Sequence, residues 1–215
     1  MELDTLLKEI YLMSFLNTFY CGNADLIIAI YDAYGDDGTL DDLGNPDVVR
    51  KRADFSGSLF SEDFNFLIKA VNEVEGSSLP ESFTDSCGKL VVGSHDESEA
   101  ESGMYSMRSD FVRVFSAASV DKVGLISNRF MSFLHRYYRD EDLNCLTQQL
   151  EEAKSSSFIS RLFGGVRKLE KKIEELNEPM DESAFYDWSG PIKDLIAVCG
   201  EASESNSEVL YYWSL

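Results

Sequence analysis

The chain has 215 residues, which is enough for one domain or two small ones with a sizeable core. Hydrophobic residues make up 44% and aromatic residues 12%, a content that excludes a globally disordered chain. There are 39 acidic residues against 19 Lys and Arg, giving a formal net charge of −20. We therefore expect the protein to repel nucleic acid and anionic membranes, and to attract basic protein surfaces or cations.

The first third of the chain is predicted to be largely helical. Apolar residues at near-helical spacing predict a buried helix over residues 4–20, and a short apolar helix is predicted over residues 25–34. The content of Gly, Asn, Asp and Pro predicts a loop over residues 35–47. Ser61, followed by one apolar face, predicts another helix over residues 61–75.

Residues 76–105 differ in composition because Ser, Gly and acidic residues dominate them. Only the sequence KLVV at residues 89–92 is typical of a strand. We expect a long exposed loop with at most a small β-hairpin. Such a segment is a candidate for a domain junction or an insertion.

Apolar residues return at helical spacing in the second half of the chain. Three stretches, at residues 123–137, 143–153 and 159–176, step by three and four. Such seams are typical of antiparallel helices packed in a bundle. The last stretch contains the one basic amphipathic segment, residues 158–172, whose positive face we expect to balance acidic neighbours in the same molecule or in a second copy. Binding to a membrane surface is the alternative for this segment.

The remaining signals lie near the C-terminus. Pro191 is expected to start a further helix and Gly200 to stop it. Residues 209–213, VLYYW, are too apolar for a free tail, so we expect them to dock on the core.

Together these patterns predict a mainly α protein, a helical bundle with one or two lobes, a long acidic loop and at most a small β-hairpin. The predicted organisation has three parts. These are an acidic helical segment over residues 1–75, the Ser-, Gly- and acid-rich loop or insertion over residues 76–105, and a helical bundle segment over residues 106–215. The first and third parts are compatible with a single domain.

The negative charge is unevenly distributed. Residues 1–105 contain 21 acidic and 6 basic residues, residues 106–173 contain 8 and 12, and residues 174–215 contain 10 and 1. Acidic residues alternate with apolar ones, so they should decorate a folded surface and not a disordered tail. A net charge of −20 also exceeds the magnitude of about 2–8 that keeps a small domain soluble.

We therefore predict that acidic residues in two segments contact a partner protein with a basic surface, because carboxylates held on a fold can imitate spaced phosphates and speed the encounter. The candidate partner-binding residues are Asp32, Asp36, Asp37, Asp41, Asp42, Asp47, Asp96, Glu97, Glu99 and Glu101. The plainer alternative is a solvated acidic surface that serves solubility alone.

The function predicted on this basis is a non-enzymatic inhibitor or antagonist that masks a basic surface, including one that binds nucleic acid. Small acidic proteins without catalytic motifs are typical of anti-restriction, anti-CRISPR and toxin-immunity proteins, although no motif in this chain matches any of them. One alternative is a structural or adaptor subunit that self-associates through the helical seams. The other is an enzyme whose site forms only in three dimensions.

Motifs for catalysis, cofactors or metals are weak, so we predict none of these. With Gly38 as the glycine of an EF-hand loop, Ala33 and Gly44 occupy the first and last ligand positions, which excludes that motif. Weak cation binding by the clustered Asp residues stays open. His95 and His135 lie in no recognisable catalytic context.

The location of the protein is predicted from its first residues and its thiols. No basic stretch followed by an apolar run begins at Met1, which predicts no signal peptide and a cytoplasmic protein. The cysteines are scattered, as expected for thiols in a reducing compartment. They are Cys21, Cys87, Cys145 and Cys199.

Overall fold

The computed structural model describes residues 16–34, 44–57, 59–93, 102–155, 165–178 and 185–214. The chain folds into two compact units. Unit 1 comprises Met1–Ser127 and Asp187–Leu215, and unit 2 comprises Asn128–Tyr186.

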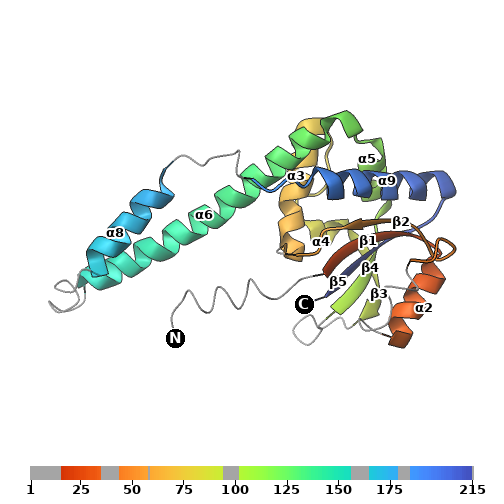
Figure 1. The fold of residues 1–215 in the computed structure, drawn as a ribbon, viewed down its shortest axis with the longest axis horizontal. Coiled ribbons are helices and arrows are strands. Elements are labelled where there is room, and N and C mark those ends of the chain that lie inside the picture. The colour runs from red at the N-terminus through yellow and green to blue at the C-terminus, as the bar shows by residue number, and fades with distance from the viewer. Residues whose placement is uncertain are drawn as a thin grey trace. The chain divides into compact units, whose positions relative to one another are not determined.

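Unit 1 is built on a five-stranded antiparallel sheet (Figure 1). The strand order is β2-β1-β5-β4-β3, so the last strand in the sequence lies in the centre, between β1 and β4. The strands are β1 (Leu16–Gly22), β2 (Val49–Asp54), β3 (Cys87–Gly93), β4 (Ser102–Met107) and β5 (Val209–Ser214). The prediction of a helical bundle with at most a small β-hairpin is therefore wrong, although the protein is rich in helix.

The first correction concerns the helix predicted over residues 4–20. Its last part is strand β1, in which every residue after Leu16 is buried; residues 4–15 lie outside the described residues. A strand covered on both faces has apolar residues in a continuous run, without the alternation that identifies a half-exposed strand. Periodicity cannot distinguish such a run from a buried helix.

The second correction concerns residues 76–105, predicted to be a long loop. They contain a short helix, α4 (Phe83–Ser86), then β3 and the start of β4, both of which are strands of the sheet. Gly103 suggested a loop, but it serves packing: a Cβ there would lie 2.9 Å from Nε1 of the Trp213 indole on β5. The glycine lets the large ring lie close to the neighbouring strand.

One face of the sheet is covered by helices α3 (Phe64–Glu75), α5 (Ser109–Ala117) and α9 (Ser189–Ser205) (Figure 1). Aromatic rings fill the space between them and the sheet. Phe19 lies in the middle, with its ring centroid 4.8 Å from that of Tyr211 and 5.5 Å from that of Phe64. The predicted helix over residues 61–75 is confirmed as a short 3-10 turn, η1 (Ser61–Asp63), followed by α3.

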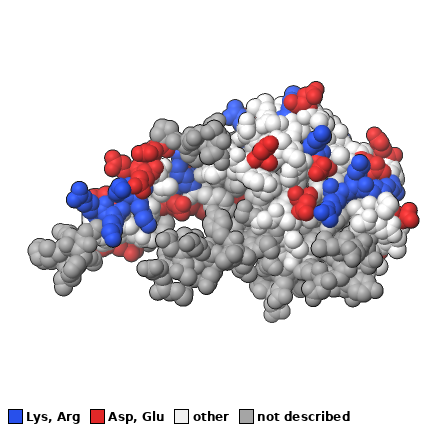
Figure 2. All heavy atoms as spheres, in the orientation of Figure 1, with Lys and Arg blue, Asp and Glu red and all other residues white. Residues whose placement is uncertain are grey.

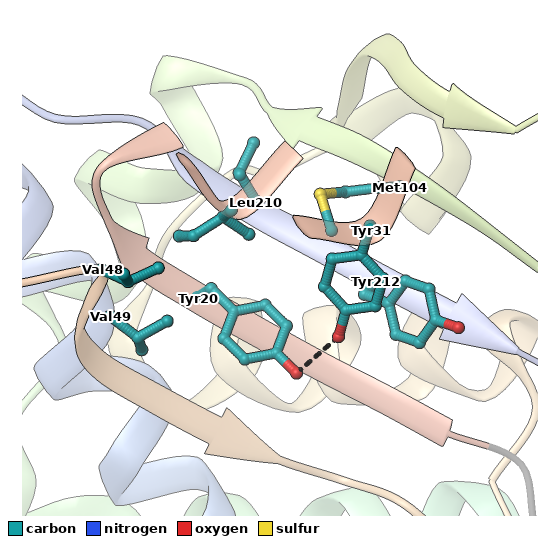
Figure 3. Close-up of a cluster of buried hydrophobic side chains, with 8 residues drawn as sticks. Tyr20, Tyr31, Val48, Val49, Met104, Leu210 and Tyr212 are labelled. Carbon is teal, nitrogen blue, oxygen red and sulfur yellow. Dashed lines mark hydrogen bonds between the residues drawn. The ribbon is translucent and has the colours of Figure 1, made fainter. Parts of the chain in front are cut away.

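The opposite face of the sheet is covered by α2 (Ala24–Tyr34), which confirms the helix predicted over residues 25–34. Figure 3 shows the cluster beneath it, in which the Tyr20 and Tyr31 hydroxyl groups point toward one another at 3.0 Å. The Tyr31 ring stacks on Tyr212 of the central strand at 4.3 Å. These contacts fix α2 on the sheet.

Unit 2 contains most of one long helix, α6 (Val123–Ser155), and a second helix, α8 (Gly165–Leu176), that runs back along it (Figure 1). The first two predicted seams are one continuous helix, so two separate helices were wrongly predicted there. The charged sequence RDED at residues 139–142 interrupts the apolar pattern, but it contains no Gly or Pro to end the helix. Lys154 Nζ lies 3.1 Å from Glu170 Oε1 and joins the two helices.

At the C-terminal end, the predicted further helix is present as α9, but it begins at Ser189, two residues before Pro191, and Gly200 does not stop it. The helix continues to Ser205 and ends at Asn206, which has the left-handed φ of 51°. Residues 209–213 do dock on the core, and they do so as the central strand β5.

The carboxylate of Glu75 at the end of α3 connects this helix to the segment before α6. It accepts hydrogen bonds from the Ser119 backbone N–H at 3.1 Å and from Lys122 Nζ at 2.9 Å. Burial raises the pKa of Glu75, but these two hydrogen bonds together outweigh burial and lower it. The ionised form is therefore the one that stabilises the fold.

We predict that Glu75→Gln lowers the free energy of unfolding by about 0.5–1 kcal/mol at pH 7. Because the folded-state pKa is lowered, the stabilisation is present above the ordinary pKa near 4.5 and is lost as the pH falls through the folded-state value. Urea unfolding at pH 7 and pH 3 measures this difference. Glu204→Gln, on the exposed side of α9, is the control; an equal loss in both variants would contradict the prediction.

Candidate functional site

A cleft of about 290 Å³ opens in unit 1, on the face of the sheet that α3, α5 and α9 cover. It lies between the sheet, η1 and α4. It receives side chains from five separate segments of the chain. The lining residues are Asn17, Leu59, Phe60, Ser61, Glu62, Phe83, Thr84, Cys87, Tyr105, Tyr211, Trp213 and Ser214. The strand register explains the convergence, because Tyr105 lies opposite Tyr211, and Trp213 lies opposite Asn17.

Asn17, at the start of β1, holds this end of the fold together. Its side-chain Nδ2 donates a hydrogen bond of 2.7 Å to the Leu59 carbonyl oxygen, and its Oδ1 accepts one of 2.6 Å from the Tyr211 hydroxyl. Its backbone carbonyl accepts a hydrogen bond from the Phe55 N–H at 2.8 Å. Asn17 is 2% exposed, so each of these bonds is protected from water. The network fastens the segment before η1 to β1 and β5.

The walls of the cleft are aromatic. Tyr211 and Phe83 are buried and form its inner part, with their rings perpendicular at 4.9 Å. Phe60, Tyr105 and Trp213 are half-buried and remain accessible from the cleft. The arrangement presents rings to any group that enters.

Electrostatics in the cleft are simple. Burial raises the pKa of Tyr211 well above its ordinary value, so the phenol stays protonated and donates to Asn17. Among the described residues that line the cleft, Glu62, exposed on η1, is the one carboxylate, and none is Lys, Arg or His. The described lining therefore favours a positively charged ligand over a negatively charged one.

The described residues of the cleft do not form a recognisable catalytic set. Cys87 lines the cleft, but no histidine is among the lining residues to act as its base. Within the described ranges, no group of three or more His, Cys, Asp or Glu side chains could hold a metal ion. His135, in unit 2, stacks on the ring of Phe185 at 4.6 Å; His95 lies outside the described residues.

Of the ten acidic residues predicted to bind a partner, the structure describes two, and neither lines the cleft. Asp32 is exposed near the end of α2, and Asp47 is exposed in the turn before β2, where its N–H donates to Asn45 Oδ1 at 3.0 Å. The other eight lie outside the described residues: Asp36, Asp37, Asp41, Asp42, Asp96, Glu97, Glu99 and Glu101.

The end of α2, which precedes the first acidic segment, lies toward the same end of the sheet as the residues that flank the second, whereas Val48, which follows the first segment, lies at the other end. Helix α2 begins beside Val48, where the Asn23 N–H donates to the Val48 carbonyl at 2.8 Å, and it reaches Tyr212 through Tyr31. Tyr212 pairs with Met104 and Met104 with Val92, so β3 ends and β4 starts at that level. The cleft, at Asn17 and Trp213, is at this end too, on the other face of the sheet.

The described surface of unit 1 that Figure 2 shows is mixed in charge. Figure 2 shows acidic and basic side chains interspersed on the visible face of unit 1, and not one continuous acidic strip. Edge strand β2 contributes three exposed basic residues, Arg50, Lys51 and Arg52. Arg50 lies 3.2 Å from Glu201 and Arg52 lies 3.6 Å from Asp54. These charges suit an edge strand that must not pair with another chain.

Sequence reasoning did not identify the cleft. Its residues are distant in sequence and of ordinary types, and the aromatic end of the chain was expected only to pack on the core. Comparison of the chain with protein-family models, curated proteins and solved structures finds no match. None of the helices in the described part of the chain is both long and apolar enough to cross a bilayer.

We predict that Tyr211→Phe lowers the free energy of unfolding by about 1–2 kcal/mol, because it leaves the buried Oδ1 of Asn17 without its donor. Tyr186→Phe, at a side chain that is 64% exposed, should change it little. Urea unfolding at pH 7 measures both. A Tyr211→Phe protein as stable as the wild type would show that the Asn17 network does not hold this end.

A pH dependence follows from the same phenol. Because the folded-state pKa of Tyr211 is raised, its contribution is complete below the ordinary pKa of 10.0 and falls as the pH rises above it, where the unfolded chain ionises first. We expect the wild type to lose more stability between pH 9 and pH 11 than the Tyr211→Phe protein does. Tyr20, whose pKa is also raised by burial, contributes equally to both.

Proposed function

We propose that the protein is a non-enzymatic binding protein that uses its acidic segments to cover a basic surface of a partner protein. The observation that carries this proposal is the position of the residues flanking those segments. The end of α2 lies toward the same end of the sheet as the end of β3 and the start of β4, although about sixty residues of sequence separate them. The chain thus enters both acidic segments at the same end of the sheet.

The described part of this end provides a firm base. α2 is held by the Tyr20–Tyr31 hydrogen bond and the Tyr31–Tyr212 stack. Asp32, on the same helix, is exposed and available to a partner. Carboxylates presented from such a base would steer a cationic partner during encounter and add contacts after docking.

The type of partner follows from the charge. A chain of net charge −20 repels phosphate, so direct contact with nucleic acid is disfavoured, while a protein surface that itself binds nucleic acid is attracted. We therefore propose an inhibitor or antagonist of the kind found among anti-defence and toxin-immunity proteins, acting in the cytoplasm. No catalytic step is part of this proposal.

The test compares two variants with the same change in charge. One replaces Asp36, Asp37, Asp41 and Asp42 with Asn. The control neutralises four exposed carboxylates of unit 2 by the substitutions Glu141→Gln, Asp142→Asn, Glu151→Gln and Glu174→Gln. Affinity capture from the native cell at low and high salt identifies the partner, and calorimetry then measures its Kd.

We expect the first variant to bind about tenfold or more weakly at low salt, and the control to bind like the wild type. Wild-type affinity should fall steeply as salt rises, since exposed charges are screened. Equal weakening by both variants would show that binding depends on the total charge of the protein and not on these four Asp residues. A partner that is itself acidic, or one indifferent to salt and to both variants, would refute the proposal.

Unit 2 favours a second candidate, a subunit that self-associates. On α8 every described apolar seam residue is only half-buried, namely Val166, Leu169, Ile173 and Leu176, and α8 alone has only 12 residues. An isolated helix of that length is marginal in water, so a second copy could add cover for the seam. Light scattering distinguishes the two candidates, because the proposed antagonist needs no self-association to bind its partner.

A further inference from the structure

We propose that the aromatic cleft of unit 1 receives a cationic side chain, Arg or Lys, from the basic partner. The inference rests on the proposed function, because it assigns to that partner a specific contact in addition to diffuse attraction. The cleft lies at the end of the sheet where the chain enters each acidic segment, although on the opposite face. One partner surface that reaches around this end would meet both.

The first argument is the ring content of the cleft. Among its twelve lining residues are Phe60, Phe83, Tyr105, Tyr211 and Trp213. Three of these rings are half-buried, so a ligand can touch them. A cation held against aromatic faces is stabilised by their quadrupoles, and guanidinium also stacks on them.

The second argument is the sign of the charge. Glu62 lies on η1 and is the carboxylate of the described lining, in which no residue is basic. An anionic ligand would meet this carboxylate without a compensating cation, in a protein whose net charge is already −20. A cation gains from both the rings and the carboxylate.

The third argument concerns the polar groups that remain for a ligand. The Tyr211 hydroxyl already donates to Asn17, and the Asn17 amide already donates to Leu59. The exposed polar side chains of the lining are those of Ser61, Glu62 and Thr84, and the half-buried Tyr105 and Trp213 combine a ring with one polar group each. A long side chain with an apolar stem and a charged head matches such a combination.

The size of the cleft sets the scale of the ligand. At about 290 Å³ it lies at the lower limit of pockets that hold drug-sized molecules, which begin at about 300 Å³. One amino-acid side chain is a more suitable occupant. The Asn17 network and the packing of Trp213 against Gly103 form this space before any ligand arrives.

The experiment uses the full chain and three small probes. They are N-acetylarginine methylamide, its neutral isostere N-acetylcitrulline methylamide, and N-acetylglutamate methylamide. The indole N–H signal of Trp213, followed by NMR at low salt, reports on the cleft. The chain has two tryptophans, and buried Trp188, which is not a lining residue, is the internal reference.

We expect the arginine probe to shift the Trp213 signal saturably, with at least fivefold weaker binding of the citrulline probe and no binding of the glutamate probe. The arginine probe should also slow alkylation of Cys87, which lines the cleft, and leave exposed Cys145 on α6 unaffected. Glu62→Gln should weaken the arginine probe about fivefold. Glu81→Gln, an equal change at an exposed carboxylate outside the cleft, should not.

Equal binding of the arginine and citrulline probes would overturn the assignment of a cationic ligand. No shift of Trp213 with any probe would overturn the site itself. Either result leaves the proposed function standing if neutralising the four Asp residues still weakens the natural partner. Conversely, a probe that binds the cleft when the natural partner ignores those Asp substitutions supports the site and refutes the acidic-segment proposal.

Discussion

Burial of the central strand on both of its faces is the constraint on which unit 1 depends. Alternate side chains of β5 point to opposite sides of the sheet. Tyr211 enters the aromatic cluster beneath the helices, 4.8 Å from Phe19, while Tyr212 stacks at 4.3 Å on Tyr31 beneath α2. These two neighbouring residues thus pack into the layers on opposite faces of the sheet, and each needs a large ring to do so. Neither layer can shift without disturbing the other.

The same strand places the candidate site. Tyr211 and Trp213 line the cleft from one face of β5, and the Tyr211 hydroxyl connects this face to Asn17 on β1. The acidic segments are flanked by elements packed on the other face and at the sheet end. If a partner contacts both, its footprint is organised by β5, although most residues that touch it come from elsewhere in the chain.

How much the sequence predicts depends on how each element is covered. Helices over residues 25–34 and 61–75 present one apolar face or carry a start signal, and both are confirmed. Strand β1 has no solvent-facing side, so its period is lost and it resembles a buried helix. The charged interruption at residues 139–142 resembles a turn, but it is helical in α6 because backbone propensity, and not charge, ends a helix.

The candidate binding surface also has one part that the sequence reveals, the acidic residues, and one part that it does not, the cleft. Acidity and its uneven distribution are properties of composition, so the amino-acid sequence alone reveals them, and Asp32 and Asp47 are indeed exposed. The cleft depends on cross-strand register, which brings Asn17 opposite Trp213 across almost two hundred residues of chain and Tyr105 opposite Tyr211 across about one hundred. No local pattern encodes such a register. Gly103 was a signal for the packing of Trp213, but glycine in a Ser- and acid-rich stretch indicates a loop more readily.

The position of β5 also has a consequence for biosynthesis. β1 and β4 have no strand between them until residues 209–214 have been made and have left the ribosome. Until then, the edges of β1 and β4 that pair with β5 have no partner strand, and open strand edges promote association with other chains. Pairing across the middle of the sheet is therefore completed only by the last strand in the sequence.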